Sequence, residues 1–158
     1  MAAVAVSHLA KRYSPTAGVV DVSFEAPAGA VTALLGRNGA GKTTTVEVCC
    51  GLRRADSGEV RVLGLDPQRD HAQLATRVGV MPQTGGSGAC GIYPSVKVTE
   101  VVRHYAALYA DPLPVDDLLE RLGLESVATT PWRRLSGGEQ QRVALARALV
   151  GRPEVAFL

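Results

Sequence analysis

The sequence predicts an α/β fold built around a parallel sheet, and three observations lead to that prediction. The run Val31–Leu35 is continuously apolar and lies between glycines, which suits a strand buried on both faces. A glycine-rich loop and a helical pattern from about Lys42 to Cys50 follow it directly. Near the end of the chain another helical pattern leads into the apolar run Glu154–Leu158, which predicts a second buried strand.

The first thirty residues predict two short strands joined by a turn. The strands are expected near Val4–Leu9 and Val19–Phe24, with Ser14-Pro15 and Ala17-Gly18 as turn signals between them.

The middle of the chain predicts two more short strands, at Glu59–Leu63 and Arg77–Met81. The segment Thr84–Gly91 is too glycine-rich for regular structure and predicts a loop. Thr99 is the expected N-cap of a helix that continues to Tyr109.

Two further helices are predicted after that one. The first covers Asp116–Leu122 and is stopped by Gly123. The second begins at a capping box, in which the Ser136 side chain accepts from a backbone amide while Glu139 reaches back, and it continues to about Val150.

Composition is that of an ordinary soluble globular domain. The 158 residues are 46% apolar and 20% charged, enough for one domain with a core. A formal net charge of +2 gives no electrostatic case for binding nucleic acid or an anionic membrane. No run approaches the roughly 20 apolar residues that cross a bilayer. The apolar opening Met1–Val6 lacks a preceding basic segment, so it predicts a strand and not a signal peptide.

The cysteines and histidines show no metal-binding pattern. Cys49, Cys50 and Cys90 cannot all pair, and the adjacent two are interpreted as small buried residues of a helix. With these features we expect a cytoplasmic protein. His8, His71 and His104 share no spacing with each other or with an acid, so no metal or catalytic role is expected for them. Trp132 is interpreted as a packing residue.

The loop Gly36-x-x-x-x-Gly41-Lys42-Thr43 follows an apolar run and opens a helix, which is the setting of a phosphate-binding loop. Glycines let successive amides point at an anion, and the helix start adds partial positive charge. Lys42 would contact the β- and γ-phosphates, and Thr43 would offer a hydroxyl to Mg²⁺. The alternative is a glycine-rich turn with a solvated lysine. Alone, the loop indicates an NTP and leaves GTPases, kinases and motors open.

A second helix start, within Leu135–Arg142, also suits an anion. A well-capped amphipathic helix would account for Ser136 and Glu139. It does not account for Gly137 and Gly138, each of which costs roughly 1 kcal/mol relative to alanine in a helix. Bare amides beside a serine hydroxyl suit a γ-phosphate.

Together, the two runs resemble the nucleotide-binding subunit of an ABC (ATP-binding cassette) transporter, over the whole chain. The resemblance implies a P-loop NTPase (RecA-like) core with an N-terminal antiparallel β region and a helical subdomain, incomplete at the C-terminus. The single domain 1–158 would comprise a β subdomain at about 1–30, a core at 31–94 and 132–158, and a helical subdomain at 95–131.

The resemblance also assigns residues to roles. Gln83 is similar to the family's Q-loop glutamine, which contacts Mg²⁺ and the attacking water, and with Lys42 it forms the implied catalytic pair. Thr43 and Gln83 are the implied Mg²⁺ ligands, and Tyr13 the residue that stacks on adenine. Plain packing remains open for Tyr13, and an ordinary exposed loop residue for Gln83. The implied ATP contacts are Tyr13, Gly36, Asn38, Gly39, Ala40, Gly41, Lys42, Thr43, Thr44, Gln83, Ser136, Gly137, Gly138 and Gln140.

Partners follow from the same resemblance. Two subunits would pair head to tail around two ATP molecules with Mg²⁺, on the cytoplasmic face of the membrane, through a separate membrane-spanning permease. Nucleic acid is not expected. The phrases Thr43-Thr44-Thr45-Val46 and Ala106-Ala107-Leu108-Tyr109 resemble the drug-export branch.

In the family, a strand like Glu154–Leu158 leads to an aspartate and a glutamate that serve Mg²⁺ and water, and the sequence stops before them. We therefore expect the 158 residues to bind nucleotide without useful hydrolysis, and to be poorly soluble because apolar faces and a sheet edge stay open. Two alternatives remain. One is a soluble ABC ATPase, although the chromosome type needs a long coiled coil and no heptads occur here. The other is a non-hydrolysing nucleotide-binding remnant.

Overall fold

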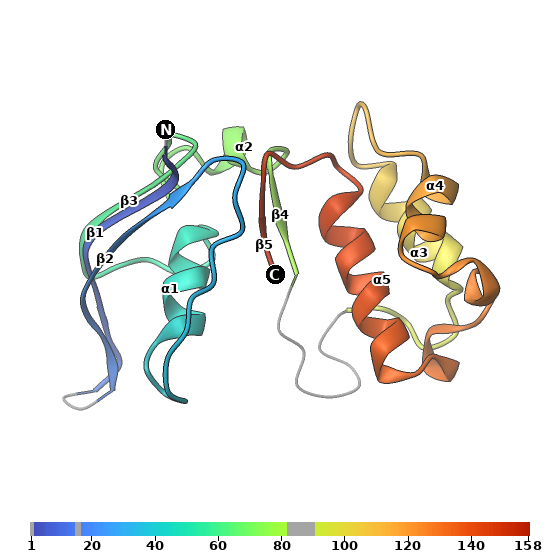
Figure 1. Cartoon of the computed structure of the whole chain (residues 1–158), viewed down its shortest axis with the longest axis horizontal. Coiled ribbons are helices and arrows are strands. Elements are labelled where there is room, and N and C mark those ends of the chain that lie inside the picture. Colours follow the sequence, from blue (N-terminus) through green and yellow to red (C-terminus); the bar gives the residue numbers. More distant parts are fainter. Residues whose placement is uncertain (1, 15–16, 82–90) are drawn as a thin grey trace. The chain divides into compact units, whose positions relative to one another are not determined.

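The computed structural model describes residues 2–14, 17–81 and 91–158 (Figure 1). It divides into two compact units, Met1–Ala75 and Thr76–Leu158, called here the N-terminal and C-terminal units. Gln83 and the predicted loop residues 84–90 lie outside the described residues.

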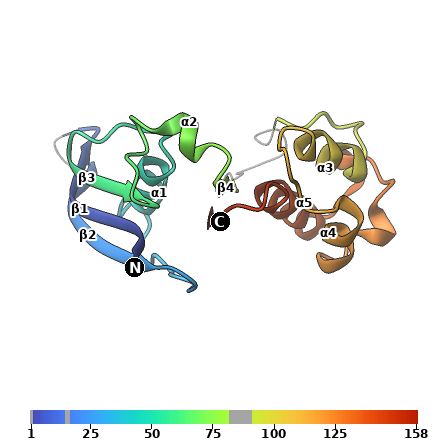
Figure 2. The same ribbon diagram turned by 90° about the horizontal axis from the view of Figure 1, so that it is seen from above.

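The N-terminal unit is built on a three-stranded antiparallel sheet. Its strands are β1 (Ala2–Arg12), β2 (Gly18–Pro27) and β3 (Ser57–Val62), in the order β2-β1-β3 (Figure 2). The pairing confirms the predicted antiparallel β region, and β1 and β2 are longer than the apolar runs suggested.

A bulge in β1 keeps its apolar residues on one face. Val4 and Val6 alternate toward the core as a regular strand requires. The register then shifts between Val6 and Leu9, where His8 has a φ of 51°. This extra residue changes the phase of the strand, so Leu9 is also fully buried.

Helix α1 (Lys42–Cys49) packs against this sheet, as Figures 1 and 2 both show. It buries Thr45, Val48 and Cys49, and the prediction of a helix after the glycine-rich loop is confirmed. Burial raises the pKa of Cys49 to about 12, which keeps its thiol protonated and unreactive. A single-turn helix, α2 (His71–Leu74), ends the unit.

The predicted strand Val31–Leu35 is wrong. Residues 31–37 have no regular secondary structure, and Val31 and Leu35 are 101% and 87% exposed. A strand exists only through its ladder, and the described residues provide no strand that pairs with this segment. Apolarity alone therefore did not make it a strand.

The C-terminal unit holds a parallel pair of strands and a helical cluster. Strands β4 (Val78–Val80) and β5 (Val155–Phe157) pair in parallel, residue for residue, which confirms that both predicted segments form strands. The predicted burial of the second strand is wrong, because Ala156 and Leu158 are exposed. Its other elements are α3 (Val98–Ala106), α4 (Val115–Arg121), the 3₁₀ turns η1 (Glu125–Val127) and η2 (Trp132–Arg134), and α5 (Gly137–Leu149).

The three helices enclose the core of this unit. Val102, Leu124 and Val143 have no exposed surface, and Trp132 is 9% exposed within the same cluster, as its interpretation as a packing residue requires. The predicted cap of α3 is wrong, since Lys97 and not Thr99 is the N-cap. The Thr99 hydroxyl instead donates to the Ala128 carbonyl at 2.8 Å and ties α3 to a neighbouring turn.

Strand β4 packs tightly on α5. A Cβ on Gly79 would lie 2.1 Å from the Ala148 carbonyl oxygen, so only glycine fits there. Beside this contact the Arg77 guanidinium donates to both carboxylate oxygens of Glu154, at 2.6 and 3.1 Å, which joins the beginnings of β4 and β5. In the described residues, no helix is long and apolar enough to span a membrane.

Candidate functional site

The candidate phosphate loop, residues 36–43, is a tight turn that leads directly into α1. The Ala40 amide donates to the Arg37 carbonyl at 3.1 Å, and Gly39 and Gly41 have φ values of 82° and 86°. Glycine is required at position 41 for two reasons. Its backbone is left-handed, and an added Cβ would lie 2.3 Å from Val19 Cγ2 on β2. The loop is thus held against the sheet at its glycine.

Lys42, the first residue of α1, folds back over this loop. Its Nζ donates to the carbonyls of Gly36 at 2.8 Å and Arg37 at 2.9 Å. The ammonium therefore lies across the loop and not in open solvent. The N-cap residue Gly41 has no side chain to satisfy the first-turn amides. An uncapped helix start with an ammonium over it favours an anion.

The three threonines after Lys42 have different surroundings. Thr45 is buried, and its hydroxyl donates to the Gly41 carbonyl at 2.9 Å. Thr44 is half-buried and shares a hydrogen bond of 3.1 Å with the Tyr13 hydroxyl. Thr43 is exposed at the second position of the helix. A neutral hydroxyl at that place fits Mg²⁺, which takes few protein ligands and completes its shell with phosphate oxygens and water.

Tyr13 directly follows β1, and the fold brings it to the candidate phosphate loop. The Tyr13–Thr44 hydrogen bond spans 31 residues of sequence and joins the turn after β1 to the first turn of α1. Tyr13 is 52% exposed. On its ring lies the Arg53 guanidinium, with the carbon atom 5.3 Å from the ring centroid.

The second helix start, at α5, is closed by its own side chains. Ser136 Oγ accepts from the Glu139 amide at 3.3 Å, and Glu139 Oε2 accepts from the Ser136 amide at 2.6 Å and its hydroxyl at 2.7 Å. The predicted capping box is thereby confirmed. These bonds lower the pKa of Glu139, the hydroxyl contributing most.

The two glycines after Ser136 face open space. A Cβ on Gly137 or Gly138 would meet nothing within 4 Å, so packing does not require glycine at either position. Gln140 is half-buried, and its Nε2 is 3.4 Å from the carbonyls of Trp132 and Leu135.

The structure thus gathers part of the predicted site in each unit. In the N-terminal unit it brings together Tyr13, Thr44 and the loop residues Gly36, Asn38, Gly39, Ala40, Gly41, Lys42 and Thr43. The C-terminal unit holds Ser136, Gly137, Gly138 and Gln140 at the start of α5. Gln83 lies outside the described residues.

The sequence did not predict two residues beside this site, or a histidine–aspartate pair that lies elsewhere in the same unit. Arg53 and Glu47 form an ion pair with Nε 2.6 Å from Oε2, next to Tyr13, and no motif marks either residue. The pair away from the site is His8 and Asp21, which share no sequence motif, with His8 Nδ1 2.6 Å from Asp21 Oδ1 across the β1–β2 ribbon. Both residues have left-handed backbones in the bulged part of that ribbon.

Comparison with known proteins decides the family. The ABC transporter family matches residues 19–158, which include the phosphate loop and the start of α5. The chain belongs to the ABC transporter family. Mixed α/β architecture with an antiparallel sheet and helices is also that of ABC ATPase domains of known structure, and the predicted fold class is confirmed.

Individual ABC proteins are similar over nearly the whole chain. The probable multidrug ABC transporter ATP-binding protein YbhF of Escherichia coli is 31% identical over 98% of the chain and 27% of its own length. The sulfate/thiosulfate import ATP-binding protein CysA of Burkholderia mallei is 37% identical over 98% of the chain and 45% of its own length. The structure of cbiO1 from Clostridium perfringens, part of the ABC transporter complex cbiONQ, has a TM-score of 0.77 and 26% identity over 98% of the chain and 64% of its own.

These relatives determine how specifically the chain can be placed within the ABC transporter family. The chain spans about a quarter and just under half of the two curated relatives named above. Their names include a multidrug transporter and a sulfate importer, so the drug-export branch stays a prediction. The predicted subdivision of the domain at residues 30, 94 and 131 stays a prediction as well.

Proposed function

We propose that this ABC domain binds ATP at residues 36–43 and serves as the nucleotide-binding part of a transporter. One observation supports it above the others. The uncapped start of α1, the Lys42 ammonium folded over the loop, and the Tyr13 side chain bonded to Thr44 all lie in one unit. An anion site and an aromatic ring at its side suit a nucleoside triphosphate.

Each residue then has a distinct part in binding. The loop amides and the Lys42 ammonium hold the phosphates, and Tyr13 lies beside the base. Thr43 would hold Mg²⁺, which when bound neutralises charge on the phosphate oxygens. Gln83 would complete the Mg²⁺ shell and position water.

The start of α5 is proposed to receive the γ-phosphate of an ATP bound by a second subunit. Its glycines have no packing role, and their exposed amides favour an anion. The Ser136 hydroxyl donates a hydrogen bond to the Glu139 carboxylate in this structure, and it would turn toward the phosphate instead. Two subunits would pair head to tail around two ATP molecules and act on a separate permease, which would hold them at the cytoplasmic face of the membrane. Proteins named for import and for export are both similar to this chain, so the proposal specifies neither direction.

Hydrolysis is proposed for the assembled transporter subunit and not for these 158 residues alone. Glu154 directly precedes β5, but its carboxylate is held by Arg77 at 2.6 and 3.1 Å. That ion pair lowers the pKa of Glu154, which gives the carboxylate a structural role and makes it a poor general base.

The decisive experiment compares Lys42→Ala with Lys97→Ala in calorimetric titrations with ATP and Mg²⁺. Loss of a charge-assisted contact of about 1.5–3 kcal/mol predicts roughly 10- to 100-fold weaker binding for Lys42→Ala. Lys97 is exposed at the start of α3 and provides the matched lysine control. Equal affinities of the two variants would contradict the proposal. Sustained phosphate release by the wild-type chain would contradict the absence of hydrolysis.

A further inference from the structure

The Tyr13 ring needs support that its backbone does not provide. Tyr13 follows the last residue of β1, Arg12, and its amide donates to the Ala17 carbonyl in the turn at 2.9 Å. The strand ladder therefore ends before Tyr13. With 52% of the residue exposed, side-chain contacts must set the orientation of the ring.

Two contacts provide that orientation, one at the tip of the ring and one on its face. The hydroxyl shares a 3.1 Å hydrogen bond with Thr44 Oγ1. The Arg53 guanidinium carbon lies 5.3 Å from the ring centroid, within the range of a cation–π contact. The guanidinium covers one face of the ring, so a base would stack on the other face.

Arg53 is itself anchored at three atoms. Its amide donates to the Glu47 carbonyl at 3.2 Å, and its carbonyl accepts from Gln68 Nε2 at 3.1 Å. Its Nε donates to Glu47 Oε2 at 2.6 Å. Glu47 and Thr44 are three residues apart on α1, so both supports of the Tyr13 ring come from one face of the helix that Lys42 begins.

We infer that Arg53, held by Glu47, is a positioning residue that orients Tyr13 to stack on the purine base of the nucleotide. The inference rests on the proposed function, because it presumes that the phosphates occupy the loop at the start of α1. Arg53 acts on the base through the Tyr13 ring and makes no contact with the phosphates. It therefore affects the affinity for ATP and leaves the affinity for a ligand without a base unchanged.

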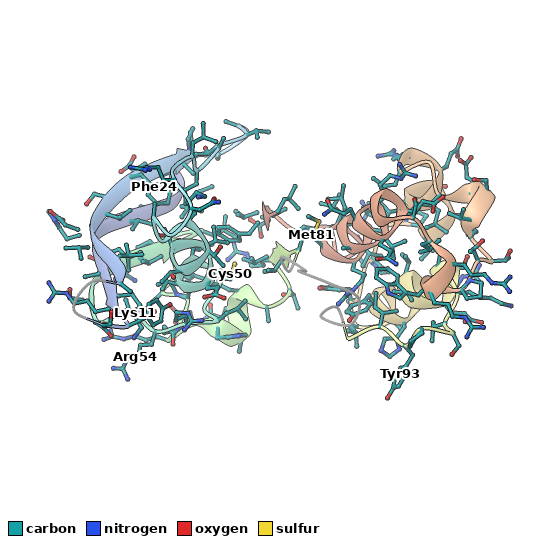
Figure 3. The ribbon with its side chains drawn as sticks, turned by 90° about the horizontal axis from the view of Figure 1, so that it is seen from below. Lys11, Phe24, Cys50, Arg54, Met81 and Tyr93 are labelled. Atoms are coloured by element: carbon teal, nitrogen blue, oxygen red, sulfur yellow. The ribbon has the colours of Figure 1, made fainter. Side chains whose placement is uncertain are left out.

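The test titrates ATP and inorganic tripolyphosphate, each with Mg²⁺, into wild type and Arg53→Gln. Loss of an exposed cation–π contact predicts about two- to fivefold weaker ATP binding and unchanged tripolyphosphate binding. Arg54→Gln is the matched control, because Arg54 is the adjacent basic residue and its side chain extends outward into solvent (Figure 3). Glu47→Gln is expected to weaken ATP binding in the same direction by releasing the guanidinium.

A double-mutant cycle with Tyr13→Ala distinguishes positioning from a direct contact. If Arg53 acts through the ring, Arg53→Gln has no further effect once the ring is absent. An equal loss for ATP and tripolyphosphate, a tighter affinity for ATP, or an undiminished effect without Tyr13 would each overturn the inference. Lys42-independent binding of both ligands would instead overturn the proposed function, and the inference with it.

Discussion

At the scale of single residues, the two helix starts of this ABC domain differ in what occupies their amides. Gly41 gives α1 no cap, whereas Ser136 and Glu139 close α5 with reciprocal hydrogen bonds. A start without a side-chain cap suits a ligand that accepts from the backbone amides, and a capped start keeps the helix stable without one. The contrast agrees with the proposal that the start of α1 binds the nucleotide of its own subunit, whereas the start of α5 contacts a nucleotide only when a second subunit brings one.

The α5 cap predicts an acid-sensitive contribution to stability. The pKa of Glu139 is lower in the folded chain, so its carboxylate stabilises the fold above the ordinary glutamate pKa. This contribution is lost as the pH falls through the lowered value. We expect Glu139→Gln to lower Tm at pH 7, and the difference from wild type to shrink between about pH 5 and pH 3. Glu120→Gln on α4 is the control, and a pH-independent difference in Tm would contradict the prediction.

At the scale of elements, contacts between segments far apart in sequence set the geometry of both units. Gly41 on the loop meets Val19 on β2, and Gly79 on β4 meets the Ala148 carbonyl of α5. The missing Cβ makes room for the Val19 side chain in the first case and for a backbone oxygen in the second. These contacts hold the phosphate loop against its sheet, and β4 against the helix that carries the second candidate anion site.

Gly79→Ala tests the contact between β4 and α5. The new Cβ would lie 2.1 Å from a backbone oxygen that cannot turn away, so strand and helix must separate. Overpacking of this kind costs about 1–3 kcal/mol, which denaturant unfolding would detect. Gly137→Ala is the matched control, because its Cβ meets nothing within 4 Å and alanine favours a helix. Equal unfolding free energies for the two variants would refute the packing argument.

At the scale of the whole molecule, the proposed function needs two copies, since each ATP would touch the loop of one subunit and the α5 start of the other. Gly138 is open to solvent and is the second residue of α5, so an aspartate there suits the helix start while repelling a phosphate. Gly138→Asp should therefore fold normally and lose only the intersubunit site.

Mixing variants tests this arrangement. Lys42→Ala and Gly138→Asp chains, each alone, are expected to stay monomeric with ATP and Mg²⁺ in analytical ultracentrifugation. A mixed pair has one intact composite site, made by the loop of one chain and the α5 start of the other, so ATP should restore dimers in the mixture. If the mixture stays monomeric with ATP and Mg²⁺, as each variant does alone, a site shared between subunits is ruled out.

Several local features were predictable because they depend on neighbours within one helical turn. The spacing of Ser136 and Glu139 was enough to predict their capping box, and Gly41 with Lys42 was enough to predict the start of α1. Thr99 shows the limit of that reasoning. Its residue type suits a cap, but the hydroxyl bonds to Ala128 and the helix begins earlier.

The sequence by itself determined the family, the helices α1, α3, α4 and α5, the antiparallel strands and the glycine-rich turn before α1, because motif spacing and local hydrogen bonding depend on residues close in the chain. Only the tertiary structure decided that the Arg53 guanidinium lies on the Tyr13 ring and that Val31–Leu35 forms no strand. The physical reason is the same for both. A cation–π contact and a strand ladder each need a partner from a distant segment, and only the folded backbone determines whether that partner is there.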